Sequence, residues 1–364
     1  MGSRLRGNDA VGNAPCVRMG CCIMIRAAIV GLGSWGKTLV GSVQGPRNHS
    51  DDIRFTTACT RTPANAQDYC REHGMQLTAN YESILADRDI DAVVLATPNS
   101  LHDSQITQAA AAGKHIYVEK PFTLTLASAR AAVAAVTRTK VTLAVGLNRR
   151  FHPNMIELTR RVREGQLGTI STMNAELTAA TGFHRPTTSW RVNAQEEPAG
   201  AMVSIGVHLV DAMMHMAGRV REVYCVAANR GGPHGDDTTH LMLQFDSGVT
   251  GLIYSSVAAT RNHRIAVYGT QGFAEVLKPQ MDTLRFIPTV AGHASHLARI
   301  PEPEVIEAPG FNYVGKSLTE FARCINAGSA YPISTHDVLH GVAVLEAAIH
   351  SAATKTPKPV QVTD

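Results

Sequence analysis

Residues 25–36 read Ile25-Arg26-Ala27-Ala28-Ile29-Val30-Gly31-Leu32-Gly33-Ser34-Trp35-Gly36. The apolar run, broken only by Arg26, predicts a buried β-strand over residues 25–30, and the glycines that follow have the spacing G-x-G-x-x-G. In this pattern Gly31 permits a tight turn, Gly33 lets the backbone approach a ligand, and Gly36 lets the next helix pack on the strand. Backbone N–H groups at the start of that helix attract phosphate. Residues 31–36 are therefore predicted to hold the pyrophosphate of a nicotinamide cofactor.

The end of the second strand, predicted at residues 53–59, indicates which cofactor is preferred. A dinucleotide site usually carries an acidic residue about 20 residues after the glycines, where it binds the ribose. This chain has Cys59-Thr60-Arg61-Thr62 there instead. Thr60 can donate a hydrogen bond to a 2′-phosphate, and Arg61 can pair with it, so the sequence favours NADP over NAD. The alternative interpretation of Arg61 is an ordinary exposed arginine.

Strand and helix patterns alternate up to about residue 147, which predicts an α/β fold with a parallel sheet covered on both faces. Residues 24–147 are expected to form this Rossmann domain. Beyond residue 148 the pattern changes to helices at 153–164 and 207–217 and to strand-like segments separated by short turns. Residues 148–364 are therefore expected to form a second α/β domain with a mostly antiparallel sheet, which binds substrate. Residues 1–23 are interpreted as a disordered N-terminal extension.

Composition narrows the class of protein. The length of 364 residues and hydrophobic content of 44% suit two domains of a globular enzyme. The formal charge of +4 is spread along the chain, which makes nucleic acid a poor partner, and no apolar run reaches the about 18 to 20 residues of a membrane span. Seven cysteines without a CxxC pair favour a cytoplasmic protein. His208, Asp211 and His215 have a spacing that could present metal ligands, but no supporting motif accompanies them and no metal is expected.

Four motifs follow one another in the order of a known family. They are Ala96-Thr97-Pro98-Asn99-Ser100-Leu101-His102, Val118-Glu119-Lys120-Pro121-Phe122, Gly146-Leu147-Asn148-Arg149-Arg150-Phe151-His152-Pro153 and Gly200-Ala201-Met202-Val203-Ser204-Ile205-Gly206-Val207-His208-Leu209-Val210-Asp211. Together with the glycine turn, they resemble the Gfo/Idh/MocA family of oxidoreductases over almost everything after Met24. The resemblance implies an open-faced antiparallel sheet in the second domain and a homo-oligomer, either a dimer or a tetramer.

The resemblance also implies which residues surround the cofactor and the reacting carbon. Besides residues 31–36, Thr60 and Arg61, the cofactor site is expected to include Thr97, Pro98, Asn99, His102, Glu119, Lys120, Asn148 and Arg149. Family members use the lysine of the EKP motif at the reacting carbon, and the matching residue is Lys120. Its neighbour Pro121 is commonly preceded by a cis peptide bond in the family.

The chemistry itself requires a group that takes a proton. Oxidation of an alcohol removes the hydroxyl proton as hydride leaves the carbon, so a base must lie beside the nicotinamide. Lys120 is expected to be the main proton-transfer group, since a desolvated lysine can have a lowered pKa, and His208 is expected to assist. A solvated surface lysine and a structural histidine are the alternative interpretations of these two residues.

The sequence departs from the family four residues before His208, where the family often carries an aspartate and this chain has Ser204. Serine can bind substrate by a hydrogen bond but cannot act as a carboxylate. Asp211 is expected to bind substrate or orient His208, with a helix cap or a salt bridge as the alternative. Trp190 and Arg191 precede the glycine-rich segment, where family members often contact cofactor or substrate; an interface role is the alternative for both and for Arg149.

These observations predict an NAD(P)-dependent dehydrogenase that acts on a secondary alcohol, or on the corresponding carbonyl, of a sugar, polyol or cyclic diol. Two alternatives within the family are a dihydrodiol dehydrogenase and a glycosidase that uses bound NAD transiently. An alternative of another class is a non-catalytic NAD(P)-binding sensor, which the replacement at Ser204 leaves open. The retention of both Lys120 and His208 argues against the sensor.

Overall fold

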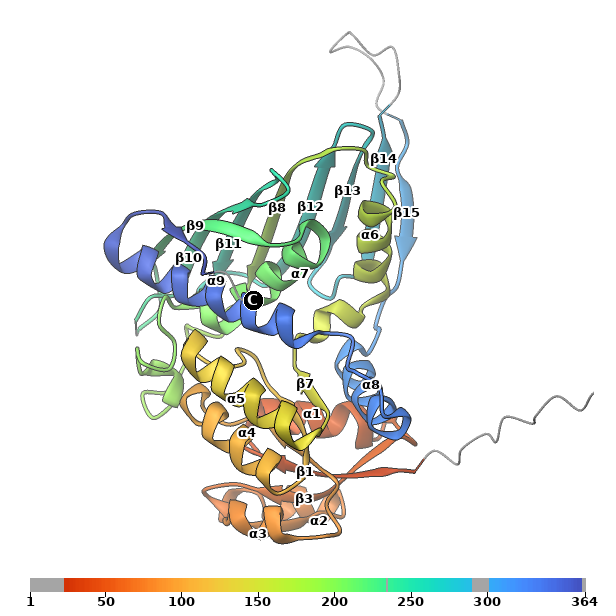
Figure 1. Cartoon of the computed structure of the whole chain (residues 1–364), viewed down its shortest axis with the longest axis vertical. Coiled ribbons are helices and arrows are strands. Elements are labelled where there is room, and N and C mark those ends of the chain that lie inside the picture. Colours follow the sequence, from red (N-terminus) through yellow and green to blue (C-terminus); the bar gives the residue numbers. More distant parts are fainter. Residues whose placement is uncertain (1–22, 234, 290–300, 362–364) are drawn as a thin grey trace, which may run out of the picture.

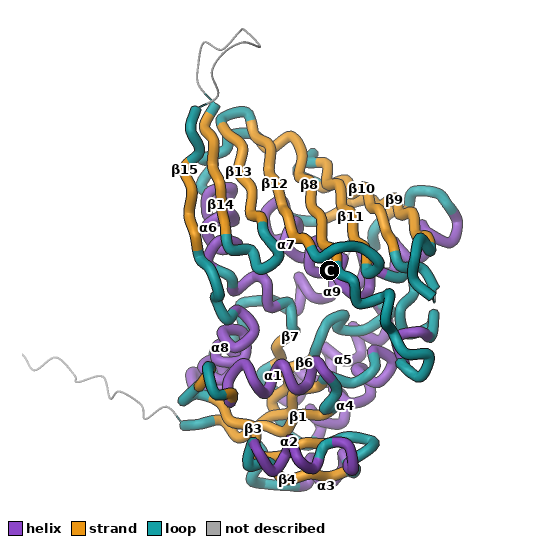
Figure 2. The backbone as a smooth tube through the Cα atoms, turned by 180° about the vertical axis from the view of Figure 1, so that it is seen from behind, coloured by secondary structure: helices purple, strands orange, loops and turns teal. Residues whose placement is uncertain are grey.

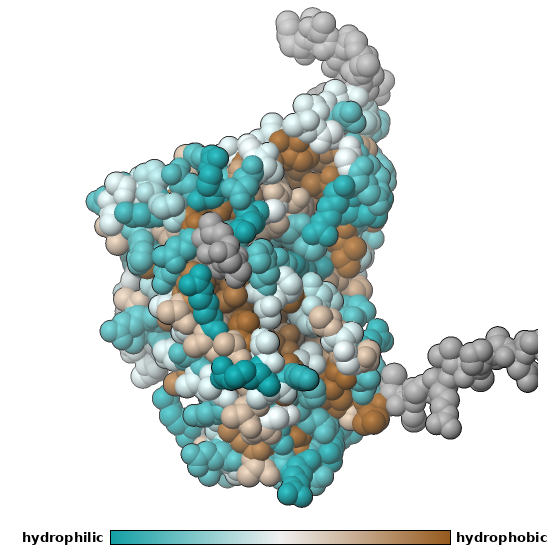
Figure 3. All heavy atoms as spheres, in the orientation of Figure 1, coloured by the Kyte–Doolittle hydropathy of each residue, from teal (hydrophilic) through white to brown (hydrophobic). Residues whose placement is uncertain are grey.

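The computed structural model describes residues 23–233, 235–289 and 301–361, which form two domains, one above the other in Figure 1. The expected N-terminal extension lies, except for its last residue, outside the described residues. No helix among the described residues is long and apolar enough to cross a membrane. On the face shown in Figure 3, hydrophilic residues cover much of both domains, and apolar residues show in separate patches between them.

The first domain is a Rossmann fold. Its elements are β1 (Ile25–Val30), α1 (Ser34–Gln44), β2 (Asn48–His49), β3 (Ile53–Cys59), η1 (Pro63–Asn65), α2 (Gln67–Glu72), β4 (Gln76–Thr78), α3 (Tyr81–Ala86), β5 (Ala92–Leu95), η2 (Asn99–Leu101), α4 (His102–Ala111), β6 (His115–Val118), α5 (Leu126–Thr139) and β7 (Leu143–Val145). The described strands form a six-stranded parallel sheet in the order β4-β3-β1-β5-β6-β7. The parallel sheet expected from the sequence is confirmed.

This strand order brings distant loops together. The chain runs from β1 outward to β3 and β4, and then from β5 outward on the other side to β6 and β7. The order therefore reverses between β1 and β5, and ligands of such sheets bind outside the carboxyl ends of the strands at that point. The glycine turn follows β1, the Thr97–Pro98 turn follows β5 and Lys120 follows β6.

The second domain continues from β7 through the short helix η3 (Asn148–Phe151). Its elements are α6 (Pro153–Arg163), β8 (Ile170–Thr178), η4 (Trp190–Val192), η5 (Met202–Gly206), α7 (Val207–Ala217), β9 (Val220–Ala228), β10 (Thr238–Phe245), β11 (Thr250–Ser256), β12 (Asn262–Gly269), β13 (Gly272–Leu277), β14 (Thr283–Pro288), β15 (Glu304–Glu307), α8 (Tyr313–Ala327), α9 (Thr335–Thr354) and β16 (Lys358–Pro359). The described strands form one sheet in the order β15-β14-β13-β12-β8-β11-β10-β9-β16, antiparallel except for the β8–β11 pair. Helices α6, α7 and α9 cover one face, and Figure 2 shows the opposite face uncovered by the described residues.

One helix of the C-terminal half packs on the first domain. Leu318, Phe321 and Ala322 of α8 are fully buried in the hydrophobic core that also contains the strands of the Rossmann sheet. The hydroxyl of Tyr117 on β6 lies 3.0 Å from the Ser317 hydroxyl of α8. The expected assignment of all residues after 147 to the second domain therefore does not hold for α8, because its apolar face completes the cover of the parallel sheet.

Candidate active site

The glycine turn has the geometry that a pyrophosphate requires. Gly31 has φ +97°, and a Cβ there would lie 2.5 Å from the Ala96 carbonyl oxygen, whereas a Cβ on Gly36 would collide with the Gly31 carbonyl oxygen. A Cβ on Gly33 would meet nothing within 4 Å. Helix α1 begins after Gly33 without a side-chain cap and without an acidic residue in its first turn. Its first N–H groups are therefore available to an anion, and these residues fit a dinucleotide.

The ribose end of this site lies after β3. Thr60 is half-buried and its backbone N–H donates to the Thr78 carbonyl at 3.1 Å, while Arg61 is exposed. This places an exposed cationic side chain, and no carboxylate, directly after the strand end. The arrangement can accept a 2′-phosphate.

The Thr97–Pro98 turn is held by several groups, among them Gln105, which accepts a hydrogen bond from the Thr97 hydroxyl at 2.6 Å. His102 is completely buried, and its ring nitrogens lie 3.0 Å from the Pro121 carbonyl oxygen and 3.3 Å from that of Thr97. Burial lowers the pKa of His102. Both ring nitrogens thus face backbone carbonyls of the two turns, so His102 positions these turns and has no nitrogen left for the cofactor, in contrast to the expectation from the sequence.

Another of these groups is Glu196, which the sequence analysis missed. Its carboxylate accepts hydrogen bonds from the backbone N–H of Ser100, at 3.0 Å, and from the Ser100 hydroxyl. Asn99 is buried and its side-chain amide donates to the Glu196 carbonyl at 2.7 Å. Glu196 belongs to the segment between β8 and η5, so it ties the second domain to the cofactor edge of the first. Only the adjacent acidic pair Glu196-Glu197 before Pro198 could have indicated this role.

Lys120 lies where β6 ends, before a cis Lys120–Pro121 peptide bond. Its Nζ donates a hydrogen bond to the backbone carbonyl oxygen of Ser204, across the two domains. Burial lowers the pKa of Lys120 to about 8; the positive charge of Arg191 acts in the same direction, and Glu119 opposes it. Roughly a tenth of this amine is therefore neutral at pH 7, the form that a base requires.

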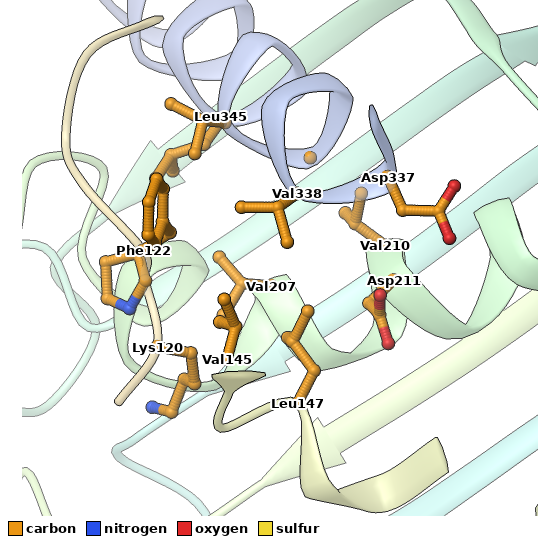
Figure 4. Close-up of a pocket in the computed structure, with 13 residues that line it drawn as sticks. Lys120, Phe122, Val145, Leu147, Val207, Val210, Asp211, Asp337, Val338 and Leu345 are labelled. Atoms are coloured by element: carbon orange, nitrogen blue, oxygen red, sulfur yellow. The ribbon is translucent and has the colours of Figure 1, made fainter. Parts of the chain in front are cut away.

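Apolar side chains back this lysine. A cavity of about 40 Å³ lies between the ends of β6 and β7 and the helices α7 and α9, and Lys120 stands at its edge (Figure 4). Its lining is almost entirely apolar and includes Phe122, Val145, Val207 and Val338. In Figure 4 the Lys120 nitrogen points away from this cavity, so the apolar residues pack behind the lysine rather than around its amine.

Ser204 and His208 lie opposite Lys120. Ser204 is in η5, a turn of π-helix, and His208 is in the first turn of α7. Both are buried, and the Ser204 hydroxyl and His208 Nδ1 have no hydrogen-bond partner in the described structure. Burial lowers the pKa of His208 well below its usual value, and the charge of Lys120 lowers it further. His208 is thus a neutral imidazole with a free nitrogen. Irregular π-turns of this kind frequently occur at functional sites.

Trp190 and Arg191 form part of a charged cluster above Lys120. The Arg191 guanidinium lies 4.1 Å from the centre of the Trp190 ring and 2.6 Å from the Glu197 carboxylate, which also binds Arg185 at 2.8 Å. The positive charge of Arg191 therefore acts on Lys120, while its guanidinium donates its hydrogen bond to Glu197.

Asp211 has a different partner from the one expected. Both of its carboxylate oxygens accept hydrogen bonds from Arg150, at 2.8 and 2.6 Å, and both side chains are buried. Arg150 also contacts Asp337 at 3.2 Å and His215 Nδ1 at 3.0 Å. The structure thus shows the salt bridge that the sequence left as the alternative, and Asp211 is not hydrogen-bonded to His208.

Asn148, Arg149 and Glu119 each retain a buried side-chain atom without a partner in the described structure: Asn148 Nδ2, Arg149 Nη1 and Glu119 Oε1. Asn148 and Glu119 follow the adjacent strands β7 and β6 at the cofactor edge. Arg149 points instead toward residues of the C-terminal half, since its guanidinium lies 6.0 Å from the centre of the Tyr313 ring. The structure therefore brings Asn148 and Glu119 to the cofactor edge but takes the charge of Arg149 toward the second domain.

Comparison with known proteins agrees with this architecture. Residues 25–147 match the oxidoreductase family with an NAD-binding Rossmann fold, and residues 155–275 match the GFO/IDH/MocA C-terminal domain. Inositol 2-dehydrogenase of Rhizobium meliloti (strain 1021) is 28% identical over 339 residues, which cover 91% of this chain and 98% of that protein. The scyllo-inositol 2-dehydrogenase (NAD(+)) of Bacillus subtilis (strain 168) is 28% identical over 358 residues, with coverages of 93% and 97%. A solved structure of levoglucosan dehydrogenase in complex with NADH has the same fold, with TM-score 0.81, 22% identity and coverages of 93% and 100%.

Proposed function

Because the chain belongs to the Gfo/Idh/MocA family of oxidoreductases, we propose that it is an NAD(P)-dependent dehydrogenase that oxidises a secondary alcohol of a sugar, polyol or cyclic diol, or reduces the corresponding carbonyl. The observation that carries the proposal is the half-buried Lys120, whose pKa is lowered to about 8 and which lies near a neutral His208 at the carboxyl edge of the Rossmann sheet. When bound, the nicotinamide accepts the hydride that leaves the carbinol carbon, and the hydroxyl proton goes to the protein.

Lys120 receives that proton in this proposal. The neutral amine has two N–H groups and one lone pair. One N–H continues to donate to the Ser204 carbonyl, which fixes the nitrogen and leaves the lone pair for the substrate hydroxyl. His208 Nδ1 has no partner within the protein and holds a second hydroxyl of the substrate or the reacting oxygen. Both groups are anchored on rigid elements, so the substrate is oriented before the transfer.

When bound, the cofactor would have its phosphates held by the N–H groups at the start of α1, and Asn148 and Glu119 would offer their unpartnered atoms to its nicotinamide end. We propose a preference for NADP over NAD because Arg61 and Thr60 offer a cation and a hydroxyl where a ribose-binding carboxylate is absent. The test is titration of the pure protein with NADPH and NADH. A ratio of dissociation constants above ten in favour of NADPH, which falls toward one in Arg61→Ala, supports this preference, and tighter binding of NADH contradicts it.

The test of the function uses the same protein with its preferred nucleotide. Tryptophan quenching measures binding, and absorbance at the nicotinamide band measures turnover on a panel of sugars, polyols and cyclic diols. We expect Lys120→Met to bind nucleotide but to lose about 10²- to 10⁴-fold in turnover, which is the usual contribution of a general base. Nucleotide binding without turnover of any class, together with no effect of Lys120→Met, would instead indicate a non-catalytic sensor.

We also propose that the uncovered face of the second-domain sheet forms a homo-oligomer interface. Val226, Met242 and Leu252 lie on three adjacent strands and are more than 40% exposed. Met242 and Leu252 are direct cross-strand partners, and Val226 is the partner of His240, two residues before Met242. An apolar patch of this kind on a sheet face marks an interaction site. Leu252→Glu should convert the oligomer to monomer in sedimentation velocity; a wild-type monomer would contradict the proposal.

We also propose a cytoplasmic location, which the buried free thiols of Cys59, Cys70, Cys225 and Cys324 support.

A further inference from the structure

Arg149 carries a positive charge for which the described residues provide no carboxylate partner. Its Nη1 is buried and makes no hydrogen bond in the described structure. The charged or titratable groups that act on it most are Tyr313 and Arg261, and Arg261 is a second cation. Arg149 as a whole is half-buried. Removing part of a guanidinium from water without a counter-charge is costly, so an anion bound beside the buried Nη1 would be favourable.

Polar atoms without partners gather around this guanidinium. His263 on β12, His208 on α7 and His152 at the start of α6 are all buried, and each has one ring nitrogen that makes no hydrogen bond in the described structure. Arg149 acts electrostatically on each of these three histidines, and Lys120 acts on His208. The structure thus places one cation and several free hydrogen-bonding nitrogens beside the proton-accepting lysine.

Two of the nearby carboxylates are paired with other arginines. Glu197 binds Arg185 and Arg191, and Asp211 binds Arg150. Glu119 acts on Lys120 and Asp282 acts on His152, but no carboxylate is among the groups that act on Arg149. The position where the family often has an aspartate is Ser204, which adds no negative charge. Arg149 is therefore the cation of this site that lacks a carboxylate partner among the described residues.

We propose that the substrate is a hydroxylated carboxylic acid, such as a sugar acid or a ring-hydroxylated acid, whose carboxylate is held by Arg149 while a secondary hydroxyl faces Lys120. The proposal rests on the dehydrogenase function and narrows its substrate class. The carboxylate takes no part in the hydride and proton transfers. It contributes binding energy and positions the secondary hydroxyl opposite Lys120. A carboxylate suits this site better than a phosphate because it is planar, carries one charge, and matches one guanidinium with neutral imidazoles around it.

The experiment compares matched substrates that differ in one group. Glucose, glucuronate, gluconate and glucose 6-phosphate are tested with the holoenzyme for kcat/KM, with galactose and galacturonate as a second pair. Variants are Arg149→Gln, Arg149→Lys and, as a control, Arg138→Gln, which changes an exposed arginine in the last turn of α5. We expect at least a 100-fold higher kcat/KM for a carboxylated member than for its neutral partner. In Arg149→Gln this ratio should fall toward one, while Arg138→Gln should keep it.

Thermal shift in the presence of nucleotide gives a readout that does not depend on turnover. The carboxylated sugars should raise the Tm of wild type and of Arg138→Gln, but not that of Arg149→Gln; Arg149→Lys serves if the glutamine variant does not fold. Equal kcat/KM for neutral and carboxylated partners, a preference for the phosphate ester, or no Tm shift with any acid overturns the substrate class and leaves the dehydrogenase standing. Loss of the dehydrogenase itself would show as no turnover of either class and no effect of Lys120→Met.

Discussion

The pH dependence of the reaction reports the environment of Lys120, and Arg191 offers a way to change it. A lysine with the ordinary pKa of 10.5 would be about 0.03% neutral at pH 7, whereas a pKa of about 8 makes it about 9% neutral. The gain is about 300-fold in the reactive form. The alcohol-oxidising kcat/KM should therefore rise with pH and level off above about pH 8, because this parameter follows the free enzyme.

Arg191→Gln should move this profile to higher pH. Arg191 lowers the pKa of Lys120 by repulsion, and its removal also leaves the negative charge of Glu197 less compensated, so both changes favour the ammonium form. Two unit charges about 10 Å apart at an effective dielectric constant of about 20 interact by about 1.7 kcal/mol, which corresponds to roughly tenfold in the neutral fraction.

The assay is kcat/KM for oxidation from pH 6 to 10 in wild type and Arg191→Gln. We expect the variant to be about tenfold slower at pH 7 and nearly as fast at pH 10, with nucleotide binding as the control for a correctly folded site. A loss that is the same at every pH would mean that Arg191 contacts substrate or cofactor directly. A wild-type profile still rising steeply above pH 9.5 would refute the assignment of the lowered pKa to Lys120.

Three further predictions test the scaffold. Asp211→Ala should lower the free energy of unfolding by about 3 to 5 kcal/mol in urea because it leaves Arg150 buried with weaker pairing, and KM should change little; a raised KM with unchanged stability would place Asp211 on the substrate. Gly33→Ala should weaken nucleotide binding more than tenfold by filling the phosphate site, whereas Gly41→Ala, equally open but farther along α1, should bind normally and add up to about 1 kcal/mol of stability. Glu196→Ala should raise KM for the nucleotide severalfold by freeing the turn at Ser100, and Glu196→Gln should restore part of the loss; equal kinetics in all three proteins would contradict this role.

The sequence pattern predicted those helices and strands whose periodicity and flanking glycines lie within one continuous segment. The strands at residues 25–30 and 53–59 and helix α7 have the bounds that periodicity and glycine punctuation predicted, because burial and capping act on consecutive residues. The edge strands β14 and β15 were not predicted. They pair with the strands directly before them in sequence, but segments of six and four residues carry little periodic signal. The return of α8 to the first domain was missed for a different reason, since an amphipathic helix does not specify which apolar surface it covers.

A residue of the candidate site was predictable where a sequence motif fixes its identity and position. Lys120, His208 and the glycine turn were found because each stands at a strand end or in a spaced pattern. His263 and Glu196 were not found, since their roles depend on convergence from β12 and from an irregular segment. The change of partner for Asp211 likewise depends on Arg150, 61 residues earlier in the chain. Burial and pairing of this kind are properties of the tertiary structure.

The serine at position 204 connects the proton chemistry to the charge of the pocket. A carboxylate beside Lys120 would stabilise the ammonium form and raise its pKa, so such a site would need another way to supply a neutral base at neutral pH. Here the Ser204 backbone carbonyl positions the Lys120 nitrogen with a hydrogen bond, and the side chain adds no negative charge. The same absence leaves Arg149 without a competitor for an incoming anion. One substitution therefore acts in the same direction on both groups: it keeps the base neutral at lower pH, and it leaves the cation free for substrate. Ser204→Asp should consequently oppose both effects at once, which distinguishes a pocket organised around charge from one in which position 204 only contributes a hydrogen bond.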